Sequence, residues 1–256
     1  MPLTHAPLLA FVAVAVALVA GCQAELAPPA APATAAEWVA ASARRHDPTA
    51  RWPAFRAEVH VATTLPGGGT YTNAVLLDRA RDTFRRRAVA GPYTLEQSVG
   101  PTGACYATYD KPDAPPAELA RAGVGVDDPC AVFGWRRGYY DFLVGLPMSA
   151  LGGGGGLSFG GAGGRVDTVV FGEPAVEVRL DYPAQPGEPT WWLYVSPLDF
   201  RLVAARFRRP RGGGEWLHYP METTFDGFVL RAAQHVYRLD GAPLSEEALT
   251  YARPES

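Results

Sequence analysis

Short segments with a two-residue hydrophobic period dominate this chain from Phe55 onward. In the first of them, apolar side chains at Phe55, Val59 and Val61 alternate with polar ones at Glu58 and His60. This alternation predicts a strand with one buried and one wet face. Similar strands, about ten in all, are predicted along the chain and joined by turns rich in Gly and Pro, at 71–77, 83–89, 93–99, 104–109, 166–171, 176–182, 191–195, 200–208, 215–225 and 228–239.

A few short helices are predicted between and before these strands. Residues Thr34 to Glu37 match a capping box, which predicts a first helix over 37–45 that stops before Asp47-Pro48. A brief helix is expected over 116–121. A stronger one is expected over 132–144, with an apolar face formed by Trp135, Tyr139, Phe142 and Leu143.

Two further segments are assigned from composition alone. The run Gly152 to Gly164 is dominated by glycine and is predicted to be a mobile loop. The segment Pro243 to Glu247 is predicted to form one terminal turn of helix.

These elements predict a mainly β (α+β) fold. About ten antiparallel strands cannot remain flat and one-sided in water, because the apolar face of the sheet needs a cover. We therefore expect a strongly curved antiparallel sheet that forms a half-barrel, plugged by two or three short helices, in one domain over residues 37–253.

The N-terminal segment predicts export and lipid attachment. An apolar run from Leu8 to Val19 is too short to span a bilayer as a helix and ends in small residues before Cys22. This ending resembles the lipobox of bacterial lipoproteins, which implies removal of residues 1–21 and acylation (palmitate) of Cys22 as a membrane anchor. An uncleaved anchor or an ordinary signal peptide is the alternative. Residues 22–36, rich in Ala and Pro, are expected to be an extended tether.

Two cysteines remain once Cys22 carries lipid. In an oxidising compartment Cys105 and Cys130 are a candidate disulfide that would close a loop rich in Pro and Gly. The alternative is two unpaired buried thiols that behave as small apolar residues.

Composition indicates an ordinary globular protein, with 48% hydrophobic and 19% charged residues and a net charge of −3. Nucleic acid is therefore not expected as a partner. Two arginine-rich stretches, 85–87 and 206–211, fit solvated strand faces and turns, or contact with anionic lipid headgroups or a partner. Sequence leaves the oligomeric state open.

Catalytic motifs are weak. The sequence Gly156-Leu157-Ser158-Phe159-Gly160 matches G-x-S-x-G, but it lies in a glycine run and not between a strand and a helix, so a catalytic Ser158 is not predicted. The single lysine, Lys111, precedes Pro112, which excludes a Walker A loop there. The histidines lack an HExxH arrangement, and His46 is expected to be a helix-end histidine with a hydrogen-bond partner. No metal, cofactor or enzymatic activity is predicted.

An aromatic and aliphatic cluster is the remaining candidate site. Its structural interpretation is an ordinary core between a helix and a sheet. Its functional interpretation is an apolar cavity under a helical lid that admits a lipid chain. The candidate lining residues are Val59, Val61, Trp135, Tyr139, Phe142, Leu143, Leu146, Met148, Trp192 and Tyr194.

The order of elements resembles a known superfamily. A helix, a strand meander, a helical interruption and a second meander, together with His46-Asp47-Pro48 and the stretch from Tyr139 to Met148, are similar to uncharacterised bacterial lipoproteins of the Lol lipoprotein-carrier-like superfamily. The resemblance implies a half-barrel that binds acyl chains of lipids or lipoproteins. By resemblance to enterobacterial lipoprotein sorting, Gln23 after the lipidated cysteine, where aspartate is absent, implies the outer membrane, facing the periplasm.

We therefore expect a non-enzymatic, membrane-tethered envelope lipoprotein that binds a lipid or acylated ligand in the concave face of the sheet. One alternative is a structural or protein-interaction lipoprotein with a packed core and no ligand. A second is a hydrolase built on unrecognised carboxylates and histidines.

Overall fold

A computed structural model describes residues 31–91, 93–100, 102, 104–110, 138–152, 154–161, 164–181 and 189–254. The chain divides into two compact units, Met1–Ala31 and Pro32–Ser256. The second unit carries all the elements described below. The predicted signal peptide and most of the predicted tether lie outside the described residues.

Four helical segments are described. Helix α1 (Ala35–His46) begins with the predicted capping box, in which the Thr34 side chain accepts from the Glu37 backbone N–H and the Glu37 carboxylate accepts from the Thr34 N–H. A single 3₁₀ turn, η1 (Trp52–Ala54), follows it. Residues 138–145 are also helical and are called the central helix here, and α4 (Met148–Gly152) follows closely. The predicted 116–121 helix and the start of the central helix lie outside the described residues.

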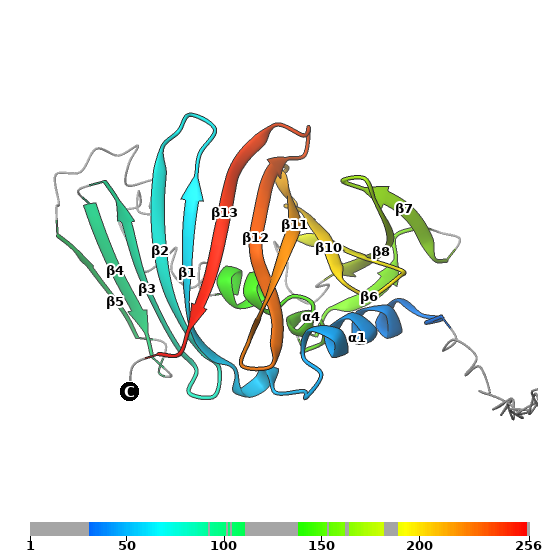
Figure 1. The fold of residues 1–256 in the computed structure, drawn as a ribbon, viewed down its shortest axis with the longest axis horizontal. Helices are drawn as coiled ribbons and strands as arrows, with labels where there is room; N and C mark the ends of the chain where they lie inside the picture. The colour runs from blue at the N-terminus through cyan, green and yellow to red at the C-terminus, as the bar shows by residue number, and fades with distance from the viewer. Residues whose placement is uncertain are drawn as a thin grey trace, which may run out of the picture. The chain divides into compact units, whose positions relative to one another are not determined.

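The strands form one antiparallel sheet of 13 strands in the described part of the chain, open and not closed into a barrel (Figure 1). Its order is β5-β4-β3-β2-β1-β13-β12-β11-β10-β9-β8-β6, with β7 also paired to β8. This confirms the predicted mainly β half-barrel. The strands are β1 (Arg56–Thr64), β2 (Thr70–Asp78), β3 (Thr83–Ala90), β4 (Tyr93–Val99), β5 (Cys105–Tyr109), β6 (Gly156–Phe159), β7 (Val166–Val170), β8 (Glu173–Asp181), β9 (Thr190–Val195), β10 (Leu202–Arg208), β11 (Gly214–Phe225), β12 (Phe228–Arg238) and β13 (Pro243–Ala252).

The prediction of a helical turn over Pro243 to Glu247 is wrong. This segment begins strand β13, which pairs with β1 on one side and with β12 on the other. Pairing on both sides satisfies the backbone of β13, and Leu249 is buried against the inner face of the sheet. The last strand thus joins the two predicted meanders into one sheet.

The prediction of an unordered loop from Gly152 to Gly164 is wrong in its middle. Residues 156–159 form β6, which pairs antiparallel with the end of β8. Leu157 and Phe159 pack against the core, so tertiary pairing and burial order a segment whose glycines gave no local reason for a strand.

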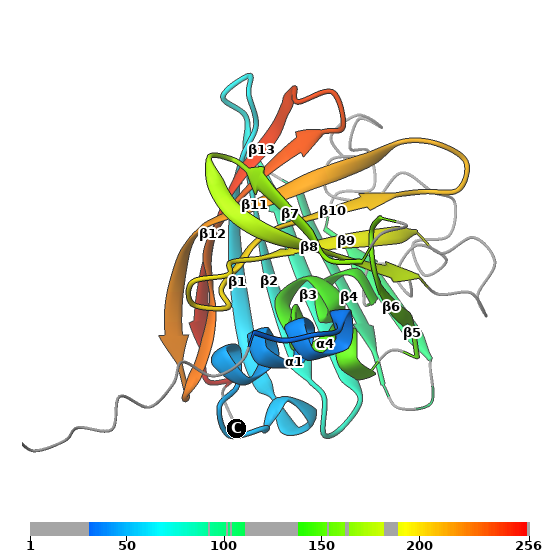
Figure 2. The same ribbon diagram turned by 90° about the vertical axis from the view of Figure 1, so that its right-hand side faces the viewer.

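The helices occupy the concave side of the curved sheet, as Figure 2 shows. Two large core clusters fill the space between them. One joins Trp38 and Val39 of α1 to the inner faces of β8 to β12, and the other joins Tyr140 and Val144 of the central helix to the inner faces of β1 to β4. The alternating strand pattern therefore buries one face of the sheet under the helices, as predicted.

Candidate functional site

A groove of about 670 Å³ lies between α1, η1 and the segment that contains the central helix and α4. We call it the helix-side groove. Its volume falls within the range of roughly 300–1,000 Å³ that small-molecule sites occupy. Leu151 lines it and remains 47% exposed. Most of the lining is apolar and includes Ala40, Ala43, Trp52, Phe142, Met148 and Leu151.

Trp52 forms a buried wall of this groove, and three contacts fix it. The Asp47 carboxylate accepts the Trp52 backbone N–H at 2.6 Å, and the Arg79 guanidinium carbon lies 4.9 Å from the centre of the indole ring. Gly145 lies against the same ring, and a Cβ at that position would overlap it. The glycine therefore allows the central helix to approach Trp52 closely.

Two ion pairs hold the helical walls in place. Arg79 pairs with Asp141 and so ties the β2–β3 turn to the central helix. Arg45 donates two hydrogen bonds to Glu222, at 2.9 and 2.7 Å, and so ties α1 to β11. Both pairs involve side chains that are only partly exposed, where a two-bond arginine–carboxylate contact is stronger than an ordinary surface pair.

His46 anchors the end of α1. Its Nδ1 lies 2.7 Å from the Val229 carbonyl, and its Nε2 lies 3.4 Å from the Leu202 backbone nitrogen, so a neutral ring that donates from Nδ1 and accepts at Nε2 satisfies both contacts. Burial lowers the pKa of His46 to about 4, although the Val229 hydrogen bond opposes the shift. The prediction of a helix-end histidine with a hydrogen-bond partner is confirmed.

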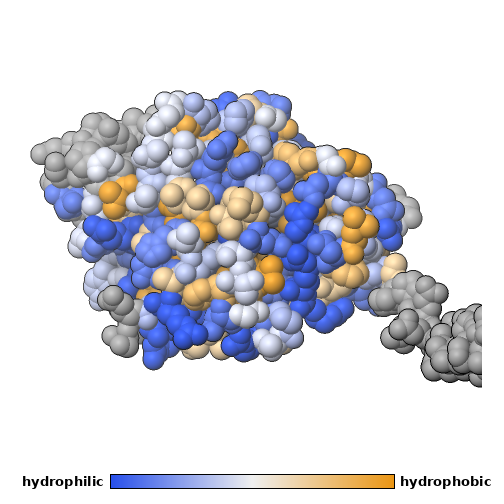
Figure 3. All heavy atoms as spheres, in the orientation of Figure 1, coloured by the Kyte–Doolittle hydropathy of each residue, from blue (hydrophilic) through white to orange (hydrophobic). Residues whose placement is uncertain are grey.

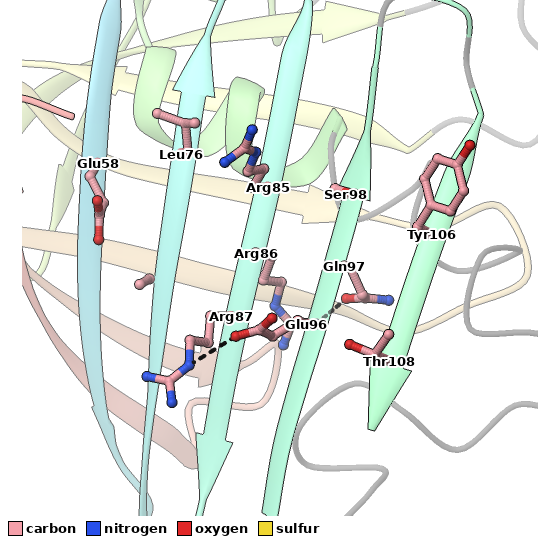
Figure 4. A pocket seen from close by; sticks show the side chains of 11 residues that line it. Glu58, Leu76, Arg85, Arg86, Arg87, Glu96, Gln97, Ser98, Tyr106 and Thr108 are labelled. Atoms are coloured by element: carbon pink, nitrogen blue, oxygen red, sulfur yellow. Dashed lines mark hydrogen bonds and ion pairs between the residues drawn. The ribbon is translucent and has the colours of Figure 1, made fainter. Parts of the chain in front are cut away.

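A second groove, of about 570 Å³, lies on the other face of the sheet over β1 to β5 (Figure 4). We call it the outer groove. Its side chains are mainly charged or hydroxylated, including Arg85, Arg87 and Glu96, and Tyr106 at its side is 70% exposed. Arg87 and Glu96 pair with each other at 3.3 Å, so part of this charge is already neutralised.

A smaller cavity of about 270 Å³ lies between the central helix and the inner face of the sheet. Its wall contains the buried Arg86, which donates to Asn73 at 2.9 Å and to Gln97 at 3.0 Å. Tyr139 also lines it, and burial raises the pKa of this tyrosine well above its usual value. The space left on the concave side is thus partly polar, whereas the sequence predicted an apolar hollow.

The structure brings most of the predicted lining residues together, but in different roles. Val59, Leu143 and Leu146 are at most 2% exposed and pack within the core clusters. Phe142 and Met148 line the helix-side groove. Val61 and Tyr139 line the inner cavity. Trp135 lies outside the described residues.

Trp192 and Tyr194 are on the opposite face of the sheet from the helices. Trp192 lies under Arg206, whose guanidinium carbon is 4.2 Å from the ring centre, and the Tyr194 hydroxyl donates to Glu177 at 2.8 Å. The neighbouring Trp191 faces inward instead, with its ring 4.6 Å from that of Phe142. Because successive strand residues point to opposite faces, the inward aliphatic Leu193 and Val195 were the signal for choosing Trp191.

The cysteine predictions are only partly within the described residues. Cys105 on β5 is disulfide-bonded. Cys130 and Cys22 lie outside the described residues, so the Cys105–Cys130 pairing and the acylation of Cys22 stay predictions.

Ser158 lies in the middle of strand β6, paired with Arg179 of β8. A nucleophile elbow requires a sharp turn between a strand and a helix, and the backbone at Ser158 is extended instead. Within the described ranges, no three His, Cys, Asp or Glu side chains gather in a way that could hold a metal ion.

Several lining residues of the helix-side groove were not predicted from the sequence. Ala40, Ala43 and Arg44 belong to a short amphipathic helix whose sequence predicts only that it packs on the sheet. Trp52 belongs to the 3₁₀ turn η1. Only the packing of α1 beside α4 brings these residues to one groove.

No protein-family model matches the chain, and no curated protein matches it by sequence. Among solved structures, it is similar to a LolA superfamily protein from Nitrosomonas europaea, with a TM-score of 0.47 and 10% identity over 88% of this chain and 96% of that one. It is also similar to a DUF1329 family protein from Desulfovibrio piger, with a TM-score of 0.45 and 7% identity over 86% and 92% of the two chains. For MucB the TM-score is 0.30, with 13% identity over 87% of this chain and 60% of MucB.

The superfamily named by the sequence resemblance is therefore among the structural neighbours. In the part of the chain that the structure describes, none of the helices has both the length and the apolar character needed to cross a bilayer.

Proposed function

We propose that this chain is a non-enzymatic lipoprotein of the bacterial cell envelope that binds one acyl chain in the helix-side groove. In this proposal the acylated Cys22 tethers the protein to the outer membrane on its periplasmic side. The part of the predicted 22–36 tether that precedes α1 would act as the spacer between the anchor and the folded domain.

The observation that carries the proposal is the apolar lining of the helix-side groove around a partly exposed Leu151. Leaving such a surface in water has a free-energy cost, and covering it with alkyl chain contributes roughly 25 cal/mol per Å² buried. Met148 adds a flexible, polarizable wall that adapts to chains of different shape. Figure 3 shows hydrophobic residues interspersed with hydrophilic ones on the face that it draws.

Filling the groove tests this function. Ala40 lies on α1, is partly exposed and lines the groove, so Ala40→Trp would occupy it without entering the core. We expect the delipidated Ala40→Trp protein to bind a neutral fluorescent alkyl probe at least about tenfold more weakly than the wild type. Ala36→Trp, one helical turn away on the same helix and exposed, is the matched control and should bind normally. Equal probe binding by both variants would contradict the proposal, as would no binding by the wild type.

The tether has its own test. Cells that produce the full chain and are fed labelled palmitate should incorporate the label into the protein, and Cys22→Ser should abolish incorporation and release the protein from membranes. Label that persists in the Cys22→Ser variant would show that the anchor is elsewhere.

A second candidate function is recognition of a protein partner by the outer groove, favoured by the 70% exposure of Tyr106. A photo-reactive residue in place of Tyr106 should then cross-link one envelope protein, and the cross-link should disappear when Arg87→Glu changes the charge of the groove. Cross-linking that is unaffected by this charge reversal would count against this role.

A further inference from the structure

The helix-side groove contains hydrogen-bond donors that no described residue satisfies. Trp52 Nε1 and Arg79 Nε are both buried atoms without a hydrogen-bond partner, and both side chains line the groove. Arg44 lines the groove too, is exposed, and forms no hydrogen bond or ion pair with any described residue. All three are N–H donors.

The two carboxylates that the structure describes in this groove are already in use. Asp141 pairs with Arg79 through the other side of the guanidinium group. Asp47 accepts from the Trp52 backbone N–H and from the Thr49 hydroxyl. A buried donor left without an acceptor is costly, and a bound group that supplies acceptors removes that cost.

Arg44 also has a purely structural interpretation that must be separated from ligand binding. It lies in the last turn of α1, where a positive charge stabilises the partial negative charge of the helix end. Its neighbour Arg45 differs because Glu222 holds it in a two-bond ion pair. Among the residues that the structure describes, Arg44 therefore has no ion-pair partner at the edge of this groove.

We infer that the helix-side groove selects a single-chain amphiphile with an anionic, acceptor-rich head, such as a long-chain carboxylate. The alkyl chain would cover the apolar wall formed by Met148 and Leu151, and the head would lie near Arg44 and accept from an unpartnered N–H group of Trp52 or Arg79. This inference rests on the proposed function and adds the chemical class of the ligand.

The test compares ligands that share one chain and differ in the head. Palmitate, hexadecanol and hexadecylamine are titrated against the delipidated full chain loaded with the neutral fluorescent alkyl probe. We expect palmitate to displace the probe at concentrations at least about tenfold lower than hexadecanol, because charge-assisted hydrogen bonds exceed neutral ones. Hexadecylamine should be the weakest of the three.

Arg44→Gln should reduce the preference for palmitate over hexadecanol to about threefold or less, while displacement by hexadecanol stays the same. Arg208→Gln, which removes an exposed arginine that does not line this groove, is the matched control and should keep the full preference. A role of Arg44 in helix stability alone would change the unfolding midpoint but not the ratio between the two ligands.

Equal displacement by palmitate and hexadecanol in the wild type would overturn the inference and leave the acyl-binding function intact. A preference for palmitate that persists in Arg44→Gln would also overturn it. Failure of all three compounds, together with failure of the probe to bind, would overturn the proposed function itself.

Discussion

The helix-side groove and the outer groove have similar volumes, about 670 and 570 Å³, but opposite chemistry. The outer groove lies on strands whose polar side chains alternate outward, and its Arg87 and Glu96 pair with each other. The helix-side groove has apolar walls and N–H donors, at Trp52 and Arg79, that have no acceptor among the described residues. The comparison teaches that volume alone does not identify a ligand site, because unsatisfied groups and exposed apolar area decide what a hollow can bind.

The largest expected effect is a pH dependence of stability from His46, which anchors the end of α1, a helix that borders the helix-side groove. The folded pKa of His46, about 4, is below its ordinary value of 6.5, so between these values the unfolded chain binds more protons than the folded one. The free energy of unfolding should therefore fall as the pH drops through this window, by about 1.4 kcal/mol per unit and about 3 kcal/mol in all, and this group should contribute no slope above it.

Chemical unfolding of the wild type and of His46→Gln at pH 7, 6 and 5 measures this slope. The variant should show a shallower dependence, with the remaining slope in the same direction because the pKa of His218 is also lowered by burial. Identical slopes in the two proteins would contradict this account of the α1 anchor.

The next effect concerns packing at the base of the helix-side groove. Gly145→Ala would force a methyl group into the Trp52 ring, and we expect a loss of about 1–3 kcal/mol in unfolding free energy. Gly138→Ala lies in the same helix with nothing within 4 Å of the added carbon, so it should be neutral or slightly stabilising. Equal effects of the two substitutions would show that Gly145 serves no close contact.

A smaller effect is expected on ligand binding. Leu151→Ser removes exposed apolar area from the groove and should weaken alkyl-probe binding by about 1 kcal/mol, or roughly fivefold, with little change in stability. Leu198→Ser removes a leucine that is 86% exposed and lies outside the groove, so its binding should equal that of the wild type. Weakened binding in both variants would place the probe outside the helix-side groove.

The smallest effect belongs to the outer groove. Arg87 and Glu96 are both more than half exposed, and exposed pairs contribute little, so Arg87→Gln should change the unfolding free energy by less than about 0.5 kcal/mol. Its alkyl-probe binding should be unchanged. A loss of probe binding in this variant would assign the acyl site to the outer face and reverse the comparison.

Local sequence patterns predicted much of the fold. The two-residue period located the inward faces of β1 and β8, and the capping box located the start of α1. The failures occurred where local signals were weak or ambiguous. Strand β6 lies in a glycine run, and β13 begins at Pro243 with a sequence that also fits a helix start, so only pairing with distant strands orders them.

The candidate site was predicted less well than the fold. Phe142 and Met148 were identified because they belong to an obvious apolar helical stretch. Ala40, Arg44 and Trp52 were missed because each is unremarkable beside its sequence neighbours, and the groove exists only where α1 packs beside α4. A site formed between elements leaves no periodic signature in any one of them.

The sequence alone determined that this chain builds an antiparallel sheet with one buried face and short helical covers, because alternation and capping are properties of neighbouring residues. Tertiary structure decided which side chains fill the concave face and which remain at a groove. It also decided that β13 joins the two meanders and that donors on Trp52 and Arg79 have no acceptor in the described part of the chain. These outcomes depend on contacts between residues far apart in the chain, whose free energies are set by close packing and not by local propensity.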